Sequence, residues 1–333
     1  MLKVLKSGLL TTIQDMGRYG YQKYGVITSG AMDPEAHRIA NLLVGNDQRA
    51  PTMEITLKGP VLEFQEDALI AVCGGKLSPM IDGETVGLWR PIYIKKGSEL
   101  RFGNPKKGFR AYLSIAGGLD VASVMGSAST YLRAEIGGYQ GRALDKGDTI
   151  DWGKPSESSK QTLKDLKEMA GSEPYQAMDW FVATEFSAPI QGECTLKVME
   201  GREFQLFTEE SQSLFFEEAF QIDSQSDRMG YRLQGNKLKL ENQKDMISEA
   251  VTFGTIQVPA EGNPIILLAD RQTTGGYPKI GQVATVDLPR IAQLKPGEQV
   301  NFQQISHKQA QYLLLEREKQ IQQLEQGIKF KNR

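Results

Sequence analysis

A succession of short strand patterns between residues 53 and 115 constrains the fold of this chain more than any other feature. Polar and apolar residues alternate over residues 53–57 and 61–64, and a turn separates these two runs. Residues 69–73 and 111–115 are short, mainly apolar runs of the length of a buried strand. Short strands at this spacing are typical of a barrel or a sandwich. The sequence therefore predicts a mainly β fold with a few helices.

Features of the first half of the chain recur in the second half in the same order. The pairs are residues 15–19 with 227–231, Glu54 with Glu249, Gly74-Gly75 with Gly275-Gly276, and residues 96–102 with 296–302. Each pair alone can arise by chance, because turn and strand patterns recur widely. Four pairs in one order favour an internal duplication, and hence two related β-barrel domains.

Changes of composition along the chain divide it into four segments. We expect an N-terminal β-barrel domain with a looped insertion (1–153), a polar linker (154–191), a C-terminal β-barrel domain (192–305) and a C-terminal helix (306–333). The linker is rich in Lys, Glu and Ser and contains a short helical pattern around residues 163–169. A helix is also predicted over residues 34–44, because Asp33 and Pro34 have the form of an N-cap followed by a first-turn proline.

Residues 270–281 form the most informative polar segment, and they follow an apolar run, residues 264–269, that is typical of a buried strand. Gly275 and Gly276 permit backbone conformations closed to other residues and can leave N–H groups open to a ligand, so we predict that they bind a cofactor. Polar groups at the end of a rigid strand suit small-molecule recognition. The alternative is a hairpin loop that happens to be polar.

Two cations in this segment are candidates for substrate contact. The planar guanidinium of Arg271 suits bidentate binding of a substrate carboxylate. Lys279 can stabilise a developing oxyanion or a phosphate as a point charge. Either residue can instead be an ordinary loop charge.

Carboxylates beside glycine-rich turns or at strand starts are candidates for a general base: Asp15, Asp33, Glu54, Asp227 and Glu249. Asp33 also has the position of a helix cap. Glu54 and Glu249 can equally be surface charges on edge strands. Asp15 beside Arg18 can form an ion pair that fixes its loop.

Composition excludes several classes of chemistry. The 39 basic and 41 acidic residues nearly cancel, so nothing favours nucleic acid or an anionic membrane as a partner. With two histidines and two cysteines, sites built from several such ligands are nearly ruled out and no metal is predicted. The two thiols and the absence of an apolar leader or a membrane-length run suggest a cytoplasmic protein. No P-loop or dinucleotide-binding glycine motif is present.

Four motifs together resemble the allophanate hydrolase subunit 2 family, also known as the biotin-dependent carboxyltransferase-like family. They are Gln14-Asp15-x-Gly17-Arg18, Ser29-Gly30-Ala31-x-Asp33, Ala116-Gly117-Gly118 and residues 270–278. The resemblance covers residues 7–302 and implies a cyclophilin-like β-barrel fold, repeated. Members include the C subunit of bacterial 5-oxoprolinase and an antagonist of a sporulation-kinase inhibitor, and this chain is similar to that group. It has no Ala-Met-Lys-Met sequence, hence no biotin attachment site.

The resemblance implies ATP-dependent opening of 5-oxoproline to glutamate. It also implies two partners that handle ATP, one similar to the A subunit of that enzyme and one similar to its B subunit, which is kinase-inhibitor-like. We expect Asp15, Glu54 and Lys279 to be catalytic. Substrate binding is assigned to Arg18, Arg271, Gln272, Thr273 and Tyr277. Two alternatives stay open: a non-catalytic regulator that binds a sporulation histidine-kinase inhibitor, and a carboxyltransferase-type protein that acts on urea- or allophanate-like amides.

Overall fold

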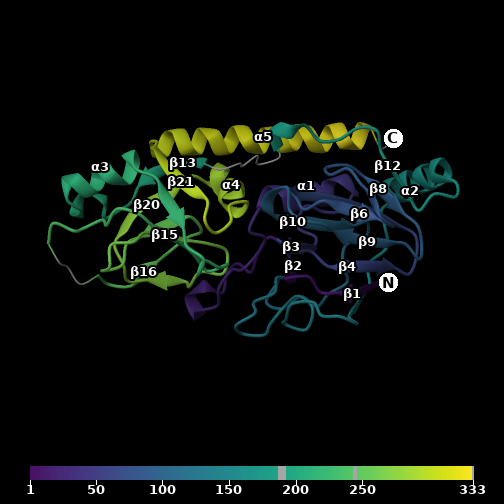
Figure 1. The fold of residues 1–333 in the computed structure, drawn as a ribbon, viewed down its shortest axis with the longest axis horizontal. Helices are drawn as coiled ribbons and strands as arrows, with labels where there is room; N and C mark the ends of the chain where they lie inside the picture. The colour runs from purple at the N-terminus through teal and green to yellow at the C-terminus, as the bar shows by residue number, and fades with distance from the viewer. Residues whose placement is uncertain (187–192, 243–245, 332–333) are drawn as a thin grey trace. The chain divides into compact units, whose positions relative to one another are not determined.

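The computed structural model describes residues 1–186, 193–242 and 246–331. The chain divides into two compact units, each built mainly of β-strands (Figure 1). Unit 1 comprises Met1–Arg18, Asp33–Pro189 and Gln320–Arg333, and unit 2 comprises Tyr19–Met32 and Ile190–Lys319. The predicted mainly β fold with a few helices is confirmed.

Unit 1 is built from two six-stranded antiparallel sheets. The first sheet has the order β11 (Thr149–Ile150), β1 (Leu2–Lys6), β4 (Val61–Phe64), β9 (Glu99–Phe102), β6 (Pro79–Ile81), β7 (Glu84–Thr85). The second has the order β12 (Tyr175–Ala177), β8 (Ile92–Ile94), β5 (Ala68–Lys76), β10 (Lys107–Ile115), β3 (Thr52–Thr56), β2 (Leu10–Gln14). Side chains from both sheets form one apolar core, which includes Phe64 of β4 and Ile55 of β3.

The two faces of the second sheet differ in chemistry. Alternate side chains of a strand point to opposite faces, so Met53 and Ile55 enter the core while Thr52 and Glu54 point the other way. These polar residues are also buried, as is Tyr112. Helix α1 (Pro34–Leu43) packs against β5 and β10. The Asp33 carboxylate accepts a hydrogen bond from the backbone N–H of Ala36, which confirms the predicted cap.

The units depart from the predicted segment boundaries in two places. Residues 154–191 are predicted to be a linker, but they contain α2 (Glu157–Ala170) and β12, which pairs with β8. Residues 187–191 of that segment lie outside the described residues. Residues 19–32 are predicted to lie in the first domain but belong to unit 2, where Met32 enters the apolar core. Both differences depend on long-range contacts that local composition does not report.

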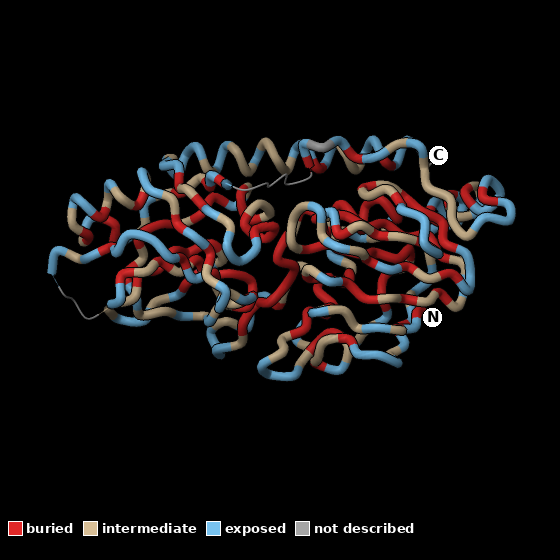
Figure 2. Tube along the Cα trace, in the orientation of Figure 1, coloured by how far each residue is buried: buried red, intermediate tan, exposed pale blue. Residues whose placement is uncertain are grey.

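Unit 2 is a closed barrel. Its strands follow the order β13 (Glu193–Glu200), β20 (Lys279–Val283), β17 (Thr255–Gln257), β18 (Ile265–Leu267), β15 (Gly230–Gln234), β14 (Phe220–Ile222), β21 (Gln299–Gln304). A parallel pairing of β13 with β21 closes it. Helices α3 (Glu209–Glu217) and α4 (Leu288–Ala292) contact β21 and β13 respectively. Short strands β16 (Glu249–Ala250) and β19 (Thr274–Gly275) form a separate pair. Buried residues concentrate on the barrel strands (Figure 2).

Helix α5 (His307–Lys331) ends the described chain, and the division between the units falls within it, after Lys319. The Ser306 hydroxyl accepts a hydrogen bond from the backbone N–H of Gln309 and so begins the helix. Among the residues that the structure describes, no helix combines the length and the apolar character that crossing a bilayer requires.

Candidate functional site

Residues 270–281 run from the end of β18 to β20 and include the short strand β19. The structure corrects one expectation here, because neither Gly275 nor Gly276 has the positive φ that only glycine adopts readily. Gly275 instead lies where a Cβ atom would come within 2.4 Å of Nε2 of Gln257. The glycine thus makes room for a buried amide side chain. Whether the pair binds a cofactor stays a prediction.

Lys279 lies in a cluster of four charged side chains in unit 2. Its Nζ is 3.4 Å from Oε2 of Glu249 and 3.7 Å from Oε2 of Glu203. Nη1 of Arg202 donates to Oε1 of Glu249 over 2.7 Å. Two cations therefore face two carboxylates. Only 12% of the Lys279 side chain is exposed, so this cation is held in place and retains limited access to solvent.

Glu203 is the buried member of this cluster, and it also fixes the Lys279 backbone. Its Oε2 accepts a hydrogen bond from the Lys279 backbone N–H at 3.1 Å. Glu203 and Lys279 come together because β13 pairs with β20. Gly201, directly after β13, lies so close to the Lys279 carbonyl that there is no room for a side chain. Glu203 was not among the predicted site residues. The Gly201-Arg202-Glu203 sequence at the end of a strand pattern was the available signal.

Glu249 is the more exposed carboxylate of the cluster, on β16. Partial burial acts to raise the pKa of this carboxyl, but the nearby cations Arg202 and Lys279 hold it below its ordinary value. Glu249 is therefore ionised at neutral pH and acts as the counter-ion of Lys279.

Arg271 is held to its own unit by three long hydrogen bonds. Its Nε donates to the Val251 carbonyl at 3.4 Å, and Nη1 donates to the Leu268 carbonyl at 3.3 Å and to Oγ1 of Thr28 at 3.2 Å. Burial lowers the pKa of Arg271 from its usual value, although the residue stays a cation at any physiological pH. Nη2 has no partner among the described residues. Arg271 alone can therefore bind a carboxylate through two parallel hydrogen bonds only if it first loses one of these three bonds to the protein.

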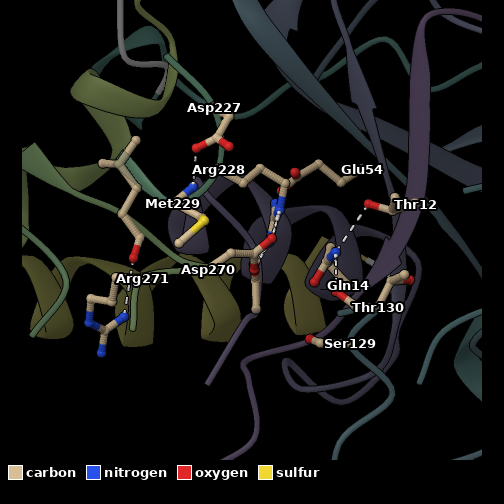
Figure 3. A network of polar contacts seen from close by, with 12 residues as sticks. Thr12, Gln14, Glu54, Ser129, Thr130, Asp227, Arg228, Met229, Asp270 and Arg271 are labelled. Carbon is tan, nitrogen blue, oxygen red and sulfur yellow. Dashed lines mark hydrogen bonds and ion pairs between the residues drawn. The ribbon is translucent and has the colours of Figure 1, made fainter. Parts of the chain in front are cut away.

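Asp270, unlike its neighbour Arg271, forms an ion pair within the described part of the protein. Both of its carboxylate oxygens accept hydrogen bonds from Arg228, at 2.8 and 3.1 Å (Figure 3). Nη2 of Arg228 also donates to the Gly30 carbonyl at 2.7 Å. This buried pair anchors residues 19–32 to the barrel of unit 2. The remaining predicted residues of the segment lie nearer the surface: Gln272 and Tyr277 are exposed, and Thr273 is half-buried.

In unit 1, Asp15 organises a loop. Its oxygens accept hydrogen bonds from the Gly17 and Ala128 backbone N–H groups and from the Ser127 and Ser129 hydroxyls, all within 2.8 Å. Nearby, the buried Arg18 donates to the Val124 and Ser129 carbonyls at 2.9 Å. Four donors on one carboxylate indicate that Asp15 orders this loop, through backbone and serine donors and not through the predicted ion pair with Arg18. Its catalytic role stays a prediction.

Glu54 is no edge-strand surface charge, because β3 lies between β10 and β2. Its Oε2 accepts a hydrogen bond from the Tyr112 hydroxyl at 2.8 Å, and Nε of Arg110 lies 3.9 Å from Oε1. Burial, and after it the charge of Glu54, raises the pKa of Tyr112 well above its ordinary value. Glu54 thus accepts a hydrogen bond from Tyr112, whose hydroxyl stays protonated.

Within residues 1–186, 193–242 and 246–331, no three His, Cys, Asp or Glu side chains come together in a way that suits a metal ion. The groups that unit 2 presents here are the fixed ammonium group of Lys279, the guanidinium group of Arg271 and the hydroxyl group of Thr28. These groups suit binding of a small anion or stabilisation of negative charge that develops on an oxygen.

Comparison with known proteins identifies the family. Residues 24–304 match the family model for the carboxyltransferase domain, subdomain A and B. The chain is 38% identical to the C subunit of Escherichia coli 5-oxoprolinase over 93% of each chain. It is 35% identical to the Haemophilus influenzae protein of the same name over the whole of both chains. The structure of Kluyveromyces lactis urea carboxylase superposes with a TM-score of 0.87 at 31% identity, over 98% of this chain and 29% of that one. The resemblance predicted from the motifs is confirmed, and the chain belongs to the carboxyltransferase domain, subdomain A and B, family.

Proposed function

We propose that this chain is one component of an ATP-dependent 5-oxoprolinase, which opens 5-oxo-L-proline to L-glutamate together with two partner subunits. The observation that carries the proposal is similarity along nearly the full length of two bacterial proteins, each named as the C subunit of 5-oxoprolinase. Such a name implies further subunits. We assign the handling of ATP to them, because this sequence contains no P-loop.

The cations of unit 2 suit the substrate of this reaction. 5-Oxoproline carries one carboxylate and one lactam carbonyl, and attack on the lactam carbon places negative charge on its oxygen. In the proposal, Lys279 stabilises that oxygen, and Glu203 and Glu249 hold the ammonium group in position. Arg271 receives the carboxylate, and Tyr277, Gln272 and Thr273 line the approach. The catalytic roles predicted from the sequence for Asp15 and Glu54 of unit 1 stay separate predictions.

The activity test uses the purified chain assembled with its two partners. We expect conversion of 5-oxoproline to glutamate only when ATP is supplied. Lys279→Ala should lower kcat by about 100-fold or more, since an oxyanion-stabilising group is removed. Arg271→Ala should act mainly on KM. Lys295→Ala, at a half-exposed lysine of a surface turn, is the matched control and should leave both constants unchanged. Full activity in both Arg271→Ala and Lys279→Ala would refute the site assignment.

A carboxyltransferase-type activity is the second candidate, because the family model and the urea carboxylase structure both support it. Dependence of amide turnover on added biotinylated carrier would favour this candidate. Accumulation of 5-oxoproline in a deletion strain would favour the 5-oxoprolinase and also argue against a purely regulatory role.

A further inference from the structure

Residues 19–32 place one of the family motifs against the barrel of unit 2. Thr28 and Gly30 are both held by arginines of the barrel: Oγ1 of Thr28 accepts from Arg271, and the Gly30 carbonyl accepts from Arg228. Ser29 lies between them in the Ser29-Gly30-Ala31-x-Asp33 motif, to which the proposed function gives no role. The two flanking contacts hold the backbone on either side of Ser29, through Thr28 to Arg271 and through Gly30 to Arg228.

Ser29 has two unusual properties. Its hydroxyl is buried and has no hydrogen-bond partner among the residues that the structure describes, whereas buried hydroxyl groups are generally bonded. Its φ is +53°, in the left-handed region that disfavours residues with a Cβ atom. A glycine would avoid the strain, and an alanine would avoid the unpaired hydroxyl. Serine therefore costs stability twice at this position, which is typical of a residue kept for binding.

Arg271 has no carboxylate partner among the described residues of the chain. No ion pair involves it in the part of the chain that the structure describes, and its neighbour Asp270 gives both oxygens to Arg228. Its three hydrogen bonds go to uncharged oxygens at 3.2–3.4 Å, which is long for N–H···O bonds. Nη2 and the hydroxyl hydrogen of Thr28 have no acceptor among the described residues. A half-buried guanidinium group with no carboxylate partner among the described residues favours an anionic ligand.

We propose that Ser29 is a further substrate-binding residue, and that it forms with Arg271 and Thr28 a site for the carboxylate of a small molecule. One carboxylate oxygen accepts from Nη2 of Arg271, and the Ser29 and Thr28 hydroxyls donate to the carboxylate. These hydroxyls supply the contacts that Arg271 cannot supply while Nε and Nη1 are bound to the protein. The identity of the ligand as 5-oxoproline rests on the proposed function, but the carboxylate site does not.

The test measures binding directly, by calorimetry, on the purified chain and on the assembled complex. The probes are 5-oxo-L-proline, L-proline, acetate and 2-pyrrolidinone, which is the same lactam without the carboxylate. We expect the carboxylates to bind and 2-pyrrolidinone to bind at least about tenfold more weakly. Ser29→Ala should weaken carboxylate binding about tenfold, because a hydrogen bond to a charged group is lost. It should leave 2-pyrrolidinone unaffected.

A stability measurement separates binding from a structural role. Ser29→Gly relieves the left-handed strain and removes the hydroxyl, so its Tm should equal or exceed that of the unchanged protein while carboxylate binding falls. A structural serine would show the reverse. Ser78→Ala is the matched control: Ser78 also has a positive φ, +49°, but its hydroxyl donates to the Asn104 carbonyl in unit 1. Carboxylate binding should not change in that variant.

Each outcome decides between the two proposals. Equal carboxylate affinity in Ser29→Ala and the unchanged protein overturns the site, as does the lack of any carboxylate binding to both the chain and the complex. If acetate and L-proline bind through Ser29 but the complex does not hydrolyse 5-oxoproline, the carboxylate site stands and the 5-oxoprolinase proposal fails.

Discussion

Unit 1 and unit 2 contain the same turn, before β9 in the one and before β21 in the other. Gly97 and Gly297 both have a φ of +89°. The Gly97 backbone N–H donates to the Phe64 carbonyl, and Gly297 donates to the Ile222 carbonyl in the same way. The backbone N–H groups of Phe64 and Ile222 donate back to the residue after each glycine. These matched bonds support the internal duplication.

The paired glycines of the two units differ. Gly74 lies within the continuous strand β5 with a φ of +91°, whereas Gly275 has an ordinary φ and belongs to the separate strand β19. Gly275 pairs with Glu249 and so lies next to the charged cluster of Lys279, Glu203 and Glu249. The comparison shows that the duplicated framework kept its strand-connecting turns and diverged where unit 2 presents its cations.

The largest expected effect concerns the buried arginine of unit 2 and its carboxylate partner. Asp270→Ala would break a buried, bidentate ion pair with Arg228, so we expect a loss of about 3–5 kcal/mol in the free energy of unfolding of unit 2. Hydrogen exchange read by mass spectrometry can assign the loss to unit 2. Asp227→Ala is the control, because Asp227 is exposed and only caps a turn. Equal losses in both variants would contradict the importance of the buried pair.

A pH dependence should distinguish unit 1 from unit 2. Burial lowers the pKa of His37 in α1 to about 4, and its Nδ1 pairs with the Thr52 hydroxyl at 2.8 Å. Since an unfolded histidine titrates near pH 6.5, the unfolded chain binds the proton first. Stability from neutral His37 is therefore complete above about pH 6.5 and is lost as the pH falls towards 4, by roughly 3 kcal/mol.

Urea unfolding between pH 7 and pH 4 measures this loss. His37→Asn should remove most of the slope in unit 1, although the substitution itself lowers stability at pH 7. His307 is exposed on α5 and supplies the control, since His307→Asn should keep the slope. An unchanged slope in His37→Asn would show that other groups carry the acid sensitivity.

The glycine pairs provide the third contrast. A Cβ atom on Gly74 would lie 2.5 Å from the Arg110 carbonyl oxygen and would also need a positive φ. We therefore expect Gly74→Ala to cost about 2–4 kcal/mol. At Gly275 the φ is ordinary and the obstacle is the end of the Gln257 side chain, which can move, so Gly275→Ala should cost about 1 kcal/mol or less. Equal costs in denaturant unfolding would mean that the two pairs have the same structural role.

Local signals in the sequence predicted much of this fold. The Asp33-Pro34 cap gave the start of α1, and alternation gave β3 and β4. The position of Glu203 beside Lys279 could not be predicted in this way, because it depends on the pairing of β13 with β20, far apart in the chain. The φ of Gly275 could not be predicted either. A glycine in a sequence can indicate an unusual backbone conformation or a close contact with a neighbouring group, and the sequence alone does not separate the two.

The smallest expected difference is between the matched turns themselves, where equivalent substitutions should cost the same in both units. A Cβ atom on Gly97 or Gly297 would meet nothing within 4 Å, so an alanine there costs only the strain of a positive φ. That strain is about 1–2 kcal/mol, and it should be the same in both units. Hydrogen exchange of Gly97→Ala and Gly297→Ala, each read in its own unit, measures the two costs separately.

Gly83→Ala is the control, because Gly83 also has a positive φ, +94°, with open space around it, and lies outside the matched pair. The contrary result is a cost of Gly97→Ala that differs from that of Gly297→Ala by more than either cost differs from that of Gly83→Ala. That result would show that the two turns are not energetically equivalent. The duplication would then be supported by the order of the sequence features alone.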